Sequence, residues 1–285
     1  MDRNKNGLVL EGGGMRGVYT AGVLDAFLEA RLEFDGCLGV SAGSCHAASY
    51  LSGQKGRAYR VNVAYLKDWR YGSFRSWMKT GDYFGAQMLY DTIPNQLDPY
   101  DYEAFDQYPG WFRAVITNME TGEAEYPLIQ DMHRDVVVLR ASSSLPLLSR
   151  PVLIDGKPYL DGGISDSIPV GEAFHQGCSR VVVVLTQCRQ YRKKPNALMP
   201  LLKAKYYRYP KLIEKLADRH VRYNQTLQWI EHLRQQGSVY VIQPEQPVSI
   251  GRLEKDRSEL HALYQQGLQD GRRHQAALRQ FLNGK

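Results

Sequence analysis

Short apolar runs alternate with segments of helical spacing along the first two thirds of the chain. Each run is bounded by glycine or polar residues, which is typical of a buried strand. These runs are residues 8–10, 37–40, 111–118 and 180–186. The segments that predict helices are residues 18–30, 55–70, 131–142 and 169–175. Strands that alternate with helices predict an α/β fold, here a three-layer α/β/α arrangement around a mostly parallel central sheet.

Two further segments predict antiparallel hairpins. Residues 123–128 follow Thr121-Gly122 and are expected to pair with the strand at 111–118. Residues 152–154 and 157–160 flank Asp155-Gly156, a two-residue sequence that is typical of a tight hairpin turn. The second arm of this hairpin ends at Asp161, so that carboxyl group is expected at the end of a strand.

The last third of the chain has a different pattern. Apolar residues recur at helical spacing from 198 to 216, with Pro200 and Pro210 expected at helix boundaries or kinks. Residues 238–242 predict one more strand. A stripe from Leu253 to Leu268 then predicts a helix, followed by a separate closing helix through Leu282. We therefore expect an α/β domain over residues 1–190 and a basic, mainly helical C-terminal extension, residues 191–285, packed on it.

Two turns between predicted strands and helices carry candidate chemistry. Gly12, Gly13 and Gly14 follow the first strand, and glycines at such a turn leave backbone amides unshielded. Ser41 is the centre of Gly39-Val40-Ser41-Ala42-Gly43, at the bend where the second strand meets a helix. A serine at such a bend displays its hydroxyl outward, and the helix N-terminus favours an anion there. Amides of the glycine turn can stabilise an oxyanion.

The glycine turn also fits a dinucleotide-binding pattern through Gly12, Gly14 and Gly17. That pattern requires an acidic residue at the end of the second strand to hold a ribose. Ser41 stands at that end, and Asp35 precedes the strand instead. The dinucleotide hypothesis is therefore disfavoured.

A third motif, Asp161-Gly162-Gly163, completes a set that resembles the patatin-like phospholipase family over residues 7–187. The resemblance implies a lipid acyl hydrolase in which Ser41 is the nucleophile and Asp161 the base of a two-residue machinery. It implies an oxyanion hole from the glycine turn together with neighbouring Arg16 and Gly17. The motif glycines 39, 43, 162 and 163 support these residues. No metal or cofactor is expected.

The residues by themselves leave other activities open. The chain could be an esterase or thioesterase for soluble acyl compounds, or a non-catalytic lipid-binding regulatory protein. None of the seven histidines falls at a convincing strand end, so a Ser-His-Asp triad is not predicted. Residues 71–111 hold 11 aromatic residues and are expected either to pack among themselves as a surface excursion or to form a cap that lines an acyl-chain pocket above Ser41.

Charge is concentrated in residues 189–222, which contain 11 Lys and Arg against two acids. A basic amphipathic segment can lie on an anionic membrane. The alternative, which the sequence slightly favours, is a solvated basic face on helices packed to the core. No recognition motif for nucleic acid accompanies the charge, so no such partner is expected. The polar N-terminus, the lack of a long apolar run and four cysteines without metal or disulfide spacing predict a cytoplasmic protein, with peripheral contact to the inner face of the membrane as an alternative.

Overall fold

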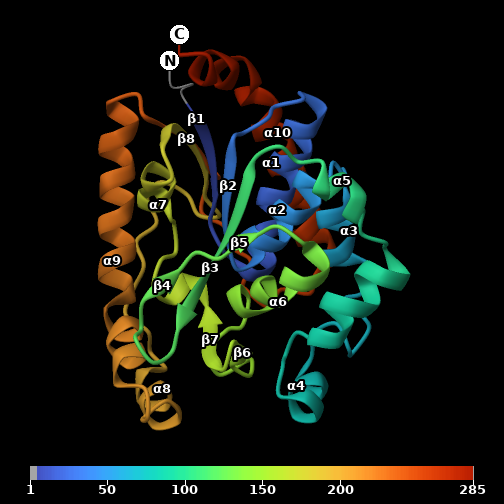
Figure 1. The fold of residues 1–285 in the computed structure, drawn as a ribbon, viewed down its shortest axis with the longest axis vertical. Coiled ribbons are helices and arrows are strands. Elements are labelled where there is room, and N and C mark those ends of the chain that lie inside the picture. The colour runs from blue at the N-terminus through green and yellow to red at the C-terminus, as the bar shows by residue number, and fades with distance from the viewer. Residues whose placement is uncertain (1–4, 285) are drawn as a thin grey trace.

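The computed structural model describes residues 5–284, and a mostly parallel sheet forms the centre of this part of the chain (Figure 1). Its main strands follow the order β6-β7-β3-β2-β1-β8-β9, and β4 and β5 pair with β3. Strands β1, β2, β3, β8 and β9 run parallel, while β7 pairs antiparallel with β3 and β6. The strands are β1 (Lys5–Leu10), β2 (Gly36–Val40), β3 (Trp111–Asn118), β4 (Ala124–Glu125), β5 (Leu128–Ile129), β6 (Val152–Ile154), β7 (Lys157–Asp161), β8 (Cys178–Val184) and β9 (Val239–Ile242).

Helices cover both faces of this sheet (Figure 1). The longer ones are α1 (Val18–Glu29), α2 (Ala42–Leu51), α6 (Met132–Ser142), α9 (Pro210–Gln235) and α10 (Arg257–Leu282). The shorter ones are α3 (Arg57–Val63), α4 (Phe74–Thr80), α5 (Tyr102–Asp106), α7 (Val170–His175), α8 (Met199–Lys205), the π-helical η2 (Met88–Leu97) and the single turns η1 (Gly14–Gly17) and η3 (Gly162–Ile164). Among residues 5–284, no helix has both the length and the apolar character needed to cross a bilayer.

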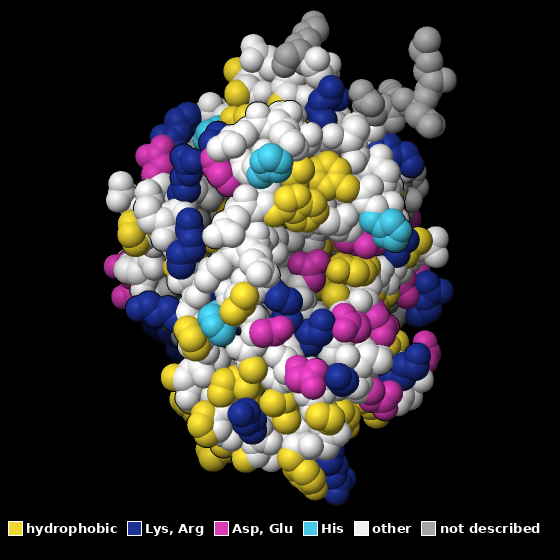
Figure 2. All heavy atoms as spheres, turned by 90° about the vertical axis from the view of Figure 1, so that its left-hand side faces the viewer, with side chains coloured by type: hydrophobic (Ala, Val, Ile, Leu, Met, Phe, Trp, Pro, Cys, Tyr) yellow, Lys and Arg dark blue, Asp and Glu magenta, His cyan; other side chains and the backbone are white. Residues whose placement is uncertain are grey.

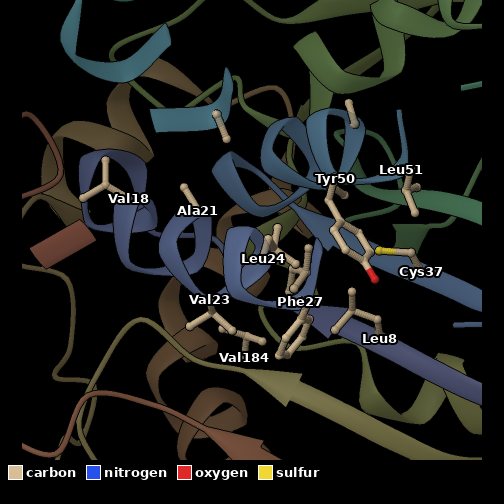
Figure 3. Packing of buried hydrophobic residues seen from close by; sticks show 14 of the residues in the cluster. Leu8, Val18, Ala21, Val23, Leu24, Phe27, Cys37, Tyr50, Leu51 and Val184 are labelled. Atoms are coloured by element: carbon tan, nitrogen blue, oxygen red, sulfur yellow. The ribbon is translucent and has the colours of Figure 1, made fainter. Parts of the chain in front are cut away.

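The central strands bury both of their faces. Successive side chains of a strand point to opposite sides of the sheet, so Leu8 joins the core beneath α1 and α2, while Val9 joins the core beneath α7 and α9. Figure 3 shows the first of these cores, where Phe27 of α1 lies among side chains of the parallel strands such as Val184. The predicted three-layer α/β/α fold is therefore confirmed.

Most predicted elements form, with two differences in helix length. The predicted helix over 55–70 is too long, since α3 ends at Val63. The prediction of two C-terminal helices is wrong, because α10 runs without a break from Arg257 to Leu282. Its glycines, Gly267 and Gly271, are buried where α10 meets α1.

The contact between α1 and α10 joins the two ends of the chain through closely approaching backbones. A Cβ atom at Gly267 would collide with the carbonyl oxygen of Tyr19. Two hydrogen bonds flank this contact: the Tyr19 hydroxyl donates to Asp270 Oδ2 at 2.8 Å, and the Tyr264 hydroxyl donates to Asp25 Oδ2 at 2.7 Å. Glycine is therefore required for helix packing at this point.

Replacing Gly267 by alanine is expected to destabilise the protein. In an unhindered helix this change stabilises by about 1 kcal/mol, but here the added methyl group must push α10 away from Tyr19, and we expect a net loss of about 2 kcal/mol. Chemical denaturation would measure the free energy of unfolding, with Gly251→Ala as control because that glycine has no neighbour near its Cβ position. Equal stabilities of the two variants would contradict the role of the close contact.

Candidate active site

Ser41 occupies the sharp bend between β2 and α2. Its backbone angles are φ 54° and ψ −127°, a strained conformation for a residue with a side chain. The Ser41 amide donates to Ser142 Oγ at 2.9 Å, and its carbonyl oxygen accepts from the Ser44 amide at 3.0 Å. The bend is thus held by backbone hydrogen bonds that do not use the Ser41 hydroxyl.

The glycines around Ser41 let the bend lie directly against β1 and its following turn. A Cβ atom at Gly43 would lie 2.6 Å from the carbonyl oxygen of Leu10, and one at Gly39 would collide with the backbone of Ser44. A Cβ atom at Gly12 would lie 2.8 Å from Ser41 Cβ. The glycine turn and the serine bend therefore touch each other.

Asp161 ends β7 and caps the η3 turn. Its Oδ1 atom accepts a hydrogen bond from the Gly163 amide at 2.8 Å. Its Oδ2 atom is buried and has no partner of normal hydrogen-bond geometry in the described chain. Gly162 is required here because a Cβ atom would collide with the carbonyl oxygen of Val115 on β3. One oxygen of the carboxyl group is fixed and the other is left for a further group.

Ser41 and Asp161 lie together. Burial raises the pKa of Asp161 above its ordinary value, while the Ser41 hydroxyl, Arg219 and the Gly163 amide act in the opposite direction. One small cavity is lined by Ser41, Asp161 and the glycine turn 12–14. The predicted nucleophile, the predicted base and the glycine turn thus border one space.

Two of the predicted oxyanion residues, Arg16 and Gly17, do not line this cavity. Gly17 packs against α2, where a Cβ atom would lie 2.6 Å from His46 Cε1. Arg16 also lies outside the lining of the cavity. Burial and then Arg252 lower the pKa of the Arg16 side chain, which is near Glu11. Of the predicted oxyanion residues, Gly12, Gly13 and Gly14 line the cavity of Ser41.

Within residues 5–284, no histidine hydrogen-bonds Ser41 or Asp161. His46, the nearest in sequence, is buried and pairs with Asn62 Nδ2 at 3.1 Å, and burial lowers its pKa to about 4. His133 stacks on Tyr102 on the outer side of the molecule. This agrees with a site that is built without imidazole.

A second, mainly apolar cavity of about 160 Å³ also has Ser41 in its lining. Its walls include rings and aliphatic side chains of the aromatic segment 71–111, among them Tyr71, Phe84 and Ile93. The segment packs on itself as well, for instance through the edge-on pair of Tyr71 and Phe84. Both interpretations of this segment from the sequence thus have a counterpart in the structure.

Several residues at the site lie outside the predicted catalytic and oxyanion set. Glu11 is buried and accepts three hydrogen bonds, from the amide and hydroxyl of Thr186 at 2.7 and 3.0 Å and from the Tyr223 hydroxyl at 2.6 Å. Arg219 of α9 and Arg252 of the loop before α10 line the cavity of Ser41 and Asp161. Glu11 and Thr186 could be linked to the site from the sequence because each follows a predicted strand. The two arginines have no sequence feature that would link them to it.

Comparisons with known proteins match two parts of the chain. A family model described as Patatin-like phospholipase matches residues 8–174, and one described as Domain of unknown function (DUF6363) matches residues 209–283. The chain is 33% identical over 195 residues to "Uncharacterized protein YjjU" of Escherichia coli (strain K12), which covers 66% of this chain and 54% of that protein.

More distant matches include fungal proteins and one solved structure. The chain is 31% identical over 187 residues to "Lysophospholipase nte1" of Aspergillus niger, covering 62% of this chain and 12% of that protein. The chain thus spans about half the length of the bacterial relative and a small part of the fungal one. The crystal structure of VipD from Legionella pneumophila superimposes with a TM-score of 0.47 at 13% identity, covering 99% of this chain and 67% of that chain.

Proposed function

The chain belongs to the patatin-like phospholipase family, and we propose that it is a lipid acyl hydrolase that cleaves carboxylic esters. The observation that carries this proposal is the shared cavity of Ser41, Asp161 and the glycine turn 12–14. The printed names of the fungal relatives, lysophospholipases, support acyl lipids as the substrate class. An apolar cavity beside Ser41 supports a substrate with a hydrocarbon chain.

In the proposed acylation step, Ser41 Oγ attacks the ester carbonyl carbon while its proton passes to the free Oδ2 atom of Asp161. The carbonyl oxygen becomes an oxyanion that accepts hydrogen bonds from the amides of Gly13 and Gly14. When the tetrahedral intermediate collapses, the bond to the alcohol breaks and the alcohol takes the proton from Asp161. In the second step, Asp161 accepts a proton from water as the water oxygen attacks the acyl carbon. When the bond between this carbon and Ser41 Oγ breaks, Asp161 returns the proton to Ser41 Oγ and the fatty acid is released.

A carboxylate at its reference pKa of about 3.9 is a weak base for a serine hydroxyl. Burial raises the pKa of Asp161 and so improves it as a base. The position of Ser41 at the N-terminus of α2 also favours negative charge as the proton leaves. Most of the stabilisation must still come from amides directed at the oxyanion.

Release of fatty acid from a panel of long-chain lysophospholipids, phospholipids and short soluble acyl esters tests the proposal. We expect turnover of at least one long-chain lipid ester. Turnover confined to the short esters or to acyl thioesters would indicate an esterase for soluble compounds instead. No turnover of any ester by folded protein would favour a lipid-binding protein without catalytic activity.

We also propose that one end of the molecule contacts an anionic membrane. Helices α4 and α8 both adjoin Leu147. The Trp77 indole of α4 donates a hydrogen bond to the Leu147 carbonyl oxygen at 3.1 Å, and the Leu147 amide donates one to the hydroxyl of Tyr206, at the end of α8, at 3.2 Å. Both helices lie at the lower end of Figure 1, and Figure 2 shows hydrophobic and basic side chains interleaved at that end. The exposed large hydrophobic residues on or next to these two helices are Phe74, Trp77, Met78, Leu198, Leu201 and Tyr207.

The mixture of exposed apolar and basic side chains suits a bilayer with anionic headgroups. The basic residues of α4 and α8 are Arg75, Lys79, Lys203 and Lys205. Because α8 belongs to the basic segment 189–222, this proposal keeps part of the predicted membrane contact and adds α4 to it. A surface of this kind would bring the cavity beside Ser41 close to its lipid.

Removing two apolar side chains from α4 is expected to weaken membrane binding. Phe74 and Met78 are 68% and 75% exposed, so Phe74→Ser/Met78→Ser should leave the core intact. We expect about a thirtyfold lower affinity for vesicles that contain phosphatidylglycerol, since each of the two side chains contributes on the order of 1 kcal/mol when it is buried in the bilayer. Vesicle co-sedimentation would measure it, with Val221→Ser on α9 as control. Equal binding of both variants would remove α4 from the proposed surface.

A further inference from the structure

Four basic side chains converge beside the cavity of Ser41 and Asp161. They are Arg16, Lys193, Arg219 and Arg252. In the described part of the chain, none of them forms an ion pair with a carboxylate. The buried Nε atoms of Arg16 and Arg219 also have no hydrogen-bond partner there. Such a cluster repels itself and attracts an anion.

Two of these arginines lie directly against the proposed catalytic groups. Arg219 Nη2 is 3.4 Å from Ser167 Oγ and would be 2.9 Å from a Cβ atom at Gly163, so its guanidinium group rests on the turn that follows Asp161. The carbonyl oxygen of Arg252 accepts the Met15 amide at 3.1 Å, which places this loop over the glycine turn. Both arginines line the cavity of Ser41 and also a neighbouring hollow of about 450 Å³.

Lys193 closes the other side of this hollow. Its backbone is fixed to α9, because its amide donates to Asn224 Oδ1 at 2.9 Å and its carbonyl accepts from Asn224 Nδ2 at 3.0 Å. Its ammonium group lies 4.1 Å from the centre of the Tyr223 ring. Burial, followed by the charge of Arg219, lowers the pKa of Lys193 to about 7. An anion bound beside it would favour its charged form.

The two carboxylates near the cluster are already engaged. Glu11 accepts hydrogen bonds from Thr186 and Tyr223. Asp161 is held by the Gly163 amide and faces Ser41. Their hydrogen bonds come from neutral donors and leave their charge in place, so two carboxylates face four basic side chains, and the excess positive charge favours an anionic ligand.

We propose that Arg219, Arg252 and Lys193 bind the phosphate of a glycerophospholipid with a net negative headgroup while Ser41 attacks its acyl ester. This inference rests on the proposed function and names its substrate class. Ser41 lines an apolar cavity that suits the acyl chain, and the small cavity that it shares with Asp161 adjoins, through Arg219 and Arg252, a basic hollow that suits the phosphate. Both groups belong to such a lipid. A guanidinium group can donate two parallel hydrogen bonds to the oxygens of one phosphate. A quaternary ammonium headgroup would add a cation to a site that already has an excess.

Turnover of substrates that share one acyl chain tests the inference. Lysophosphatidylglycerol, lysophosphatidylcholine and the uncharged monoacylglycerol differ only in the headgroup. Of the three substrates, we expect the wild type to have the highest kcat/KM for the anionic lipid. Its selectivity is the kcat/KM for the anionic lipid divided by the kcat/KM for the uncharged one. We expect Arg219→Gln and Lys193→Gln each to lower this selectivity about tenfold. Lys211→Gln, an exposed residue of the same helix, is the control for lost charge.

A binding experiment separates this inference from the hydrolase activity itself. Calorimetric titration of Ser41→Ala protein with sn-glycerol 3-phosphate should give binding that weakens about tenfold when Arg219→Gln is added. Arg219→Lys keeps the positive charge and should retain part of the affinity for sn-glycerol 3-phosphate. This variant replaces Arg219→Gln in the experiment if the glutamine variant does not fold. Inorganic phosphate should bind more weakly than the glycerol ester.

The outcomes are distinct. Ester hydrolysis without headgroup selectivity would overturn the inference and leave the proposed function intact. Absence of any hydrolysis would remove the proposed function, and an unchanged titration in the Arg219 variant would overturn the phosphate site independently. Free phosphate that binds as tightly as glycerol 3-phosphate and changes the turnover of all esters equally would indicate a regulatory anion site instead of a headgroup site.

Discussion

Alanine in place of Ser41 is expected to lower kcat by a factor of at least about 10³ and to abolish labelling by a fluorophosphonate probe, because loss of a covalent nucleophile removes the acyl-enzyme route. The fold should survive the change. The bend is held by the Ser41 backbone and Ser142, and alanine at φ 54° is strained to the same degree as serine. Mass spectrometry of the labelled protein and fatty-acid release would measure the two effects.

The thiol of Cys45, one turn further along α2, is the natural control for this experiment. Burial raises the pKa of Cys45, so the thiol stays protonated and is a poor nucleophile. We expect fluorophosphonate labelling to persist in Cys45→Ala. Labelling that persists in Ser41→Ala and disappears in Cys45→Ala would reassign the nucleophile and contradict the proposed mechanism.

Ser41 and Asp161 lie together because β7 is the neighbour of β3 in the sheet, and the sequence does not reveal this strand pairing. In the register of the sheet, Val40 pairs with Val115 of β3, and the next residue of β3, Ile116, pairs with Asp161. Ser41 follows β2 and Asp161 ends β7, so only β3 lies between the strands that carry the two residues. The sequence predicted the strand ends correctly because turn glycines and apolar runs are local signals. It could not predict that β7 pairs antiparallel with β3.

The two arginines beside the site illustrate a different limit. Arg219 lies in a helix whose sequence pattern indicates only a basic face, and Arg252 lies in a loop without any motif. Their approach to the glycine turn results from the packing of α9 and from the loop that leads into α10. Such long-range packing leaves no periodic signal in a single sequence.

Asparagine in place of Asp161 is expected to reduce kcat by a factor on the order of 10³, because the amide cannot take the proton of Ser41. Asparagine keeps the shape of the side chain, and its oxygen can still accept the Gly163 amide. Since the two residues act on one step, the Ser41→Ala/Asp161→Asn double variant should be no slower than the slower single variant. Losses that multiply would contradict a shared step.

The pH profile of the wild type tests the same assignment. Asp161 must be ionised to act as a base, and burial raises its pKa, so kcat/KM should fall as the pH decreases through a value above the ordinary one for aspartate. His46 could produce a similar acid limb, because its pKa is lowered to about 4. A carboxyl group ionises with little enthalpy, so the midpoint should hardly move with temperature, whereas an imidazole midpoint would shift. If the midpoint of the acid limb shifts strongly with temperature, the base is a histidine and not Asp161.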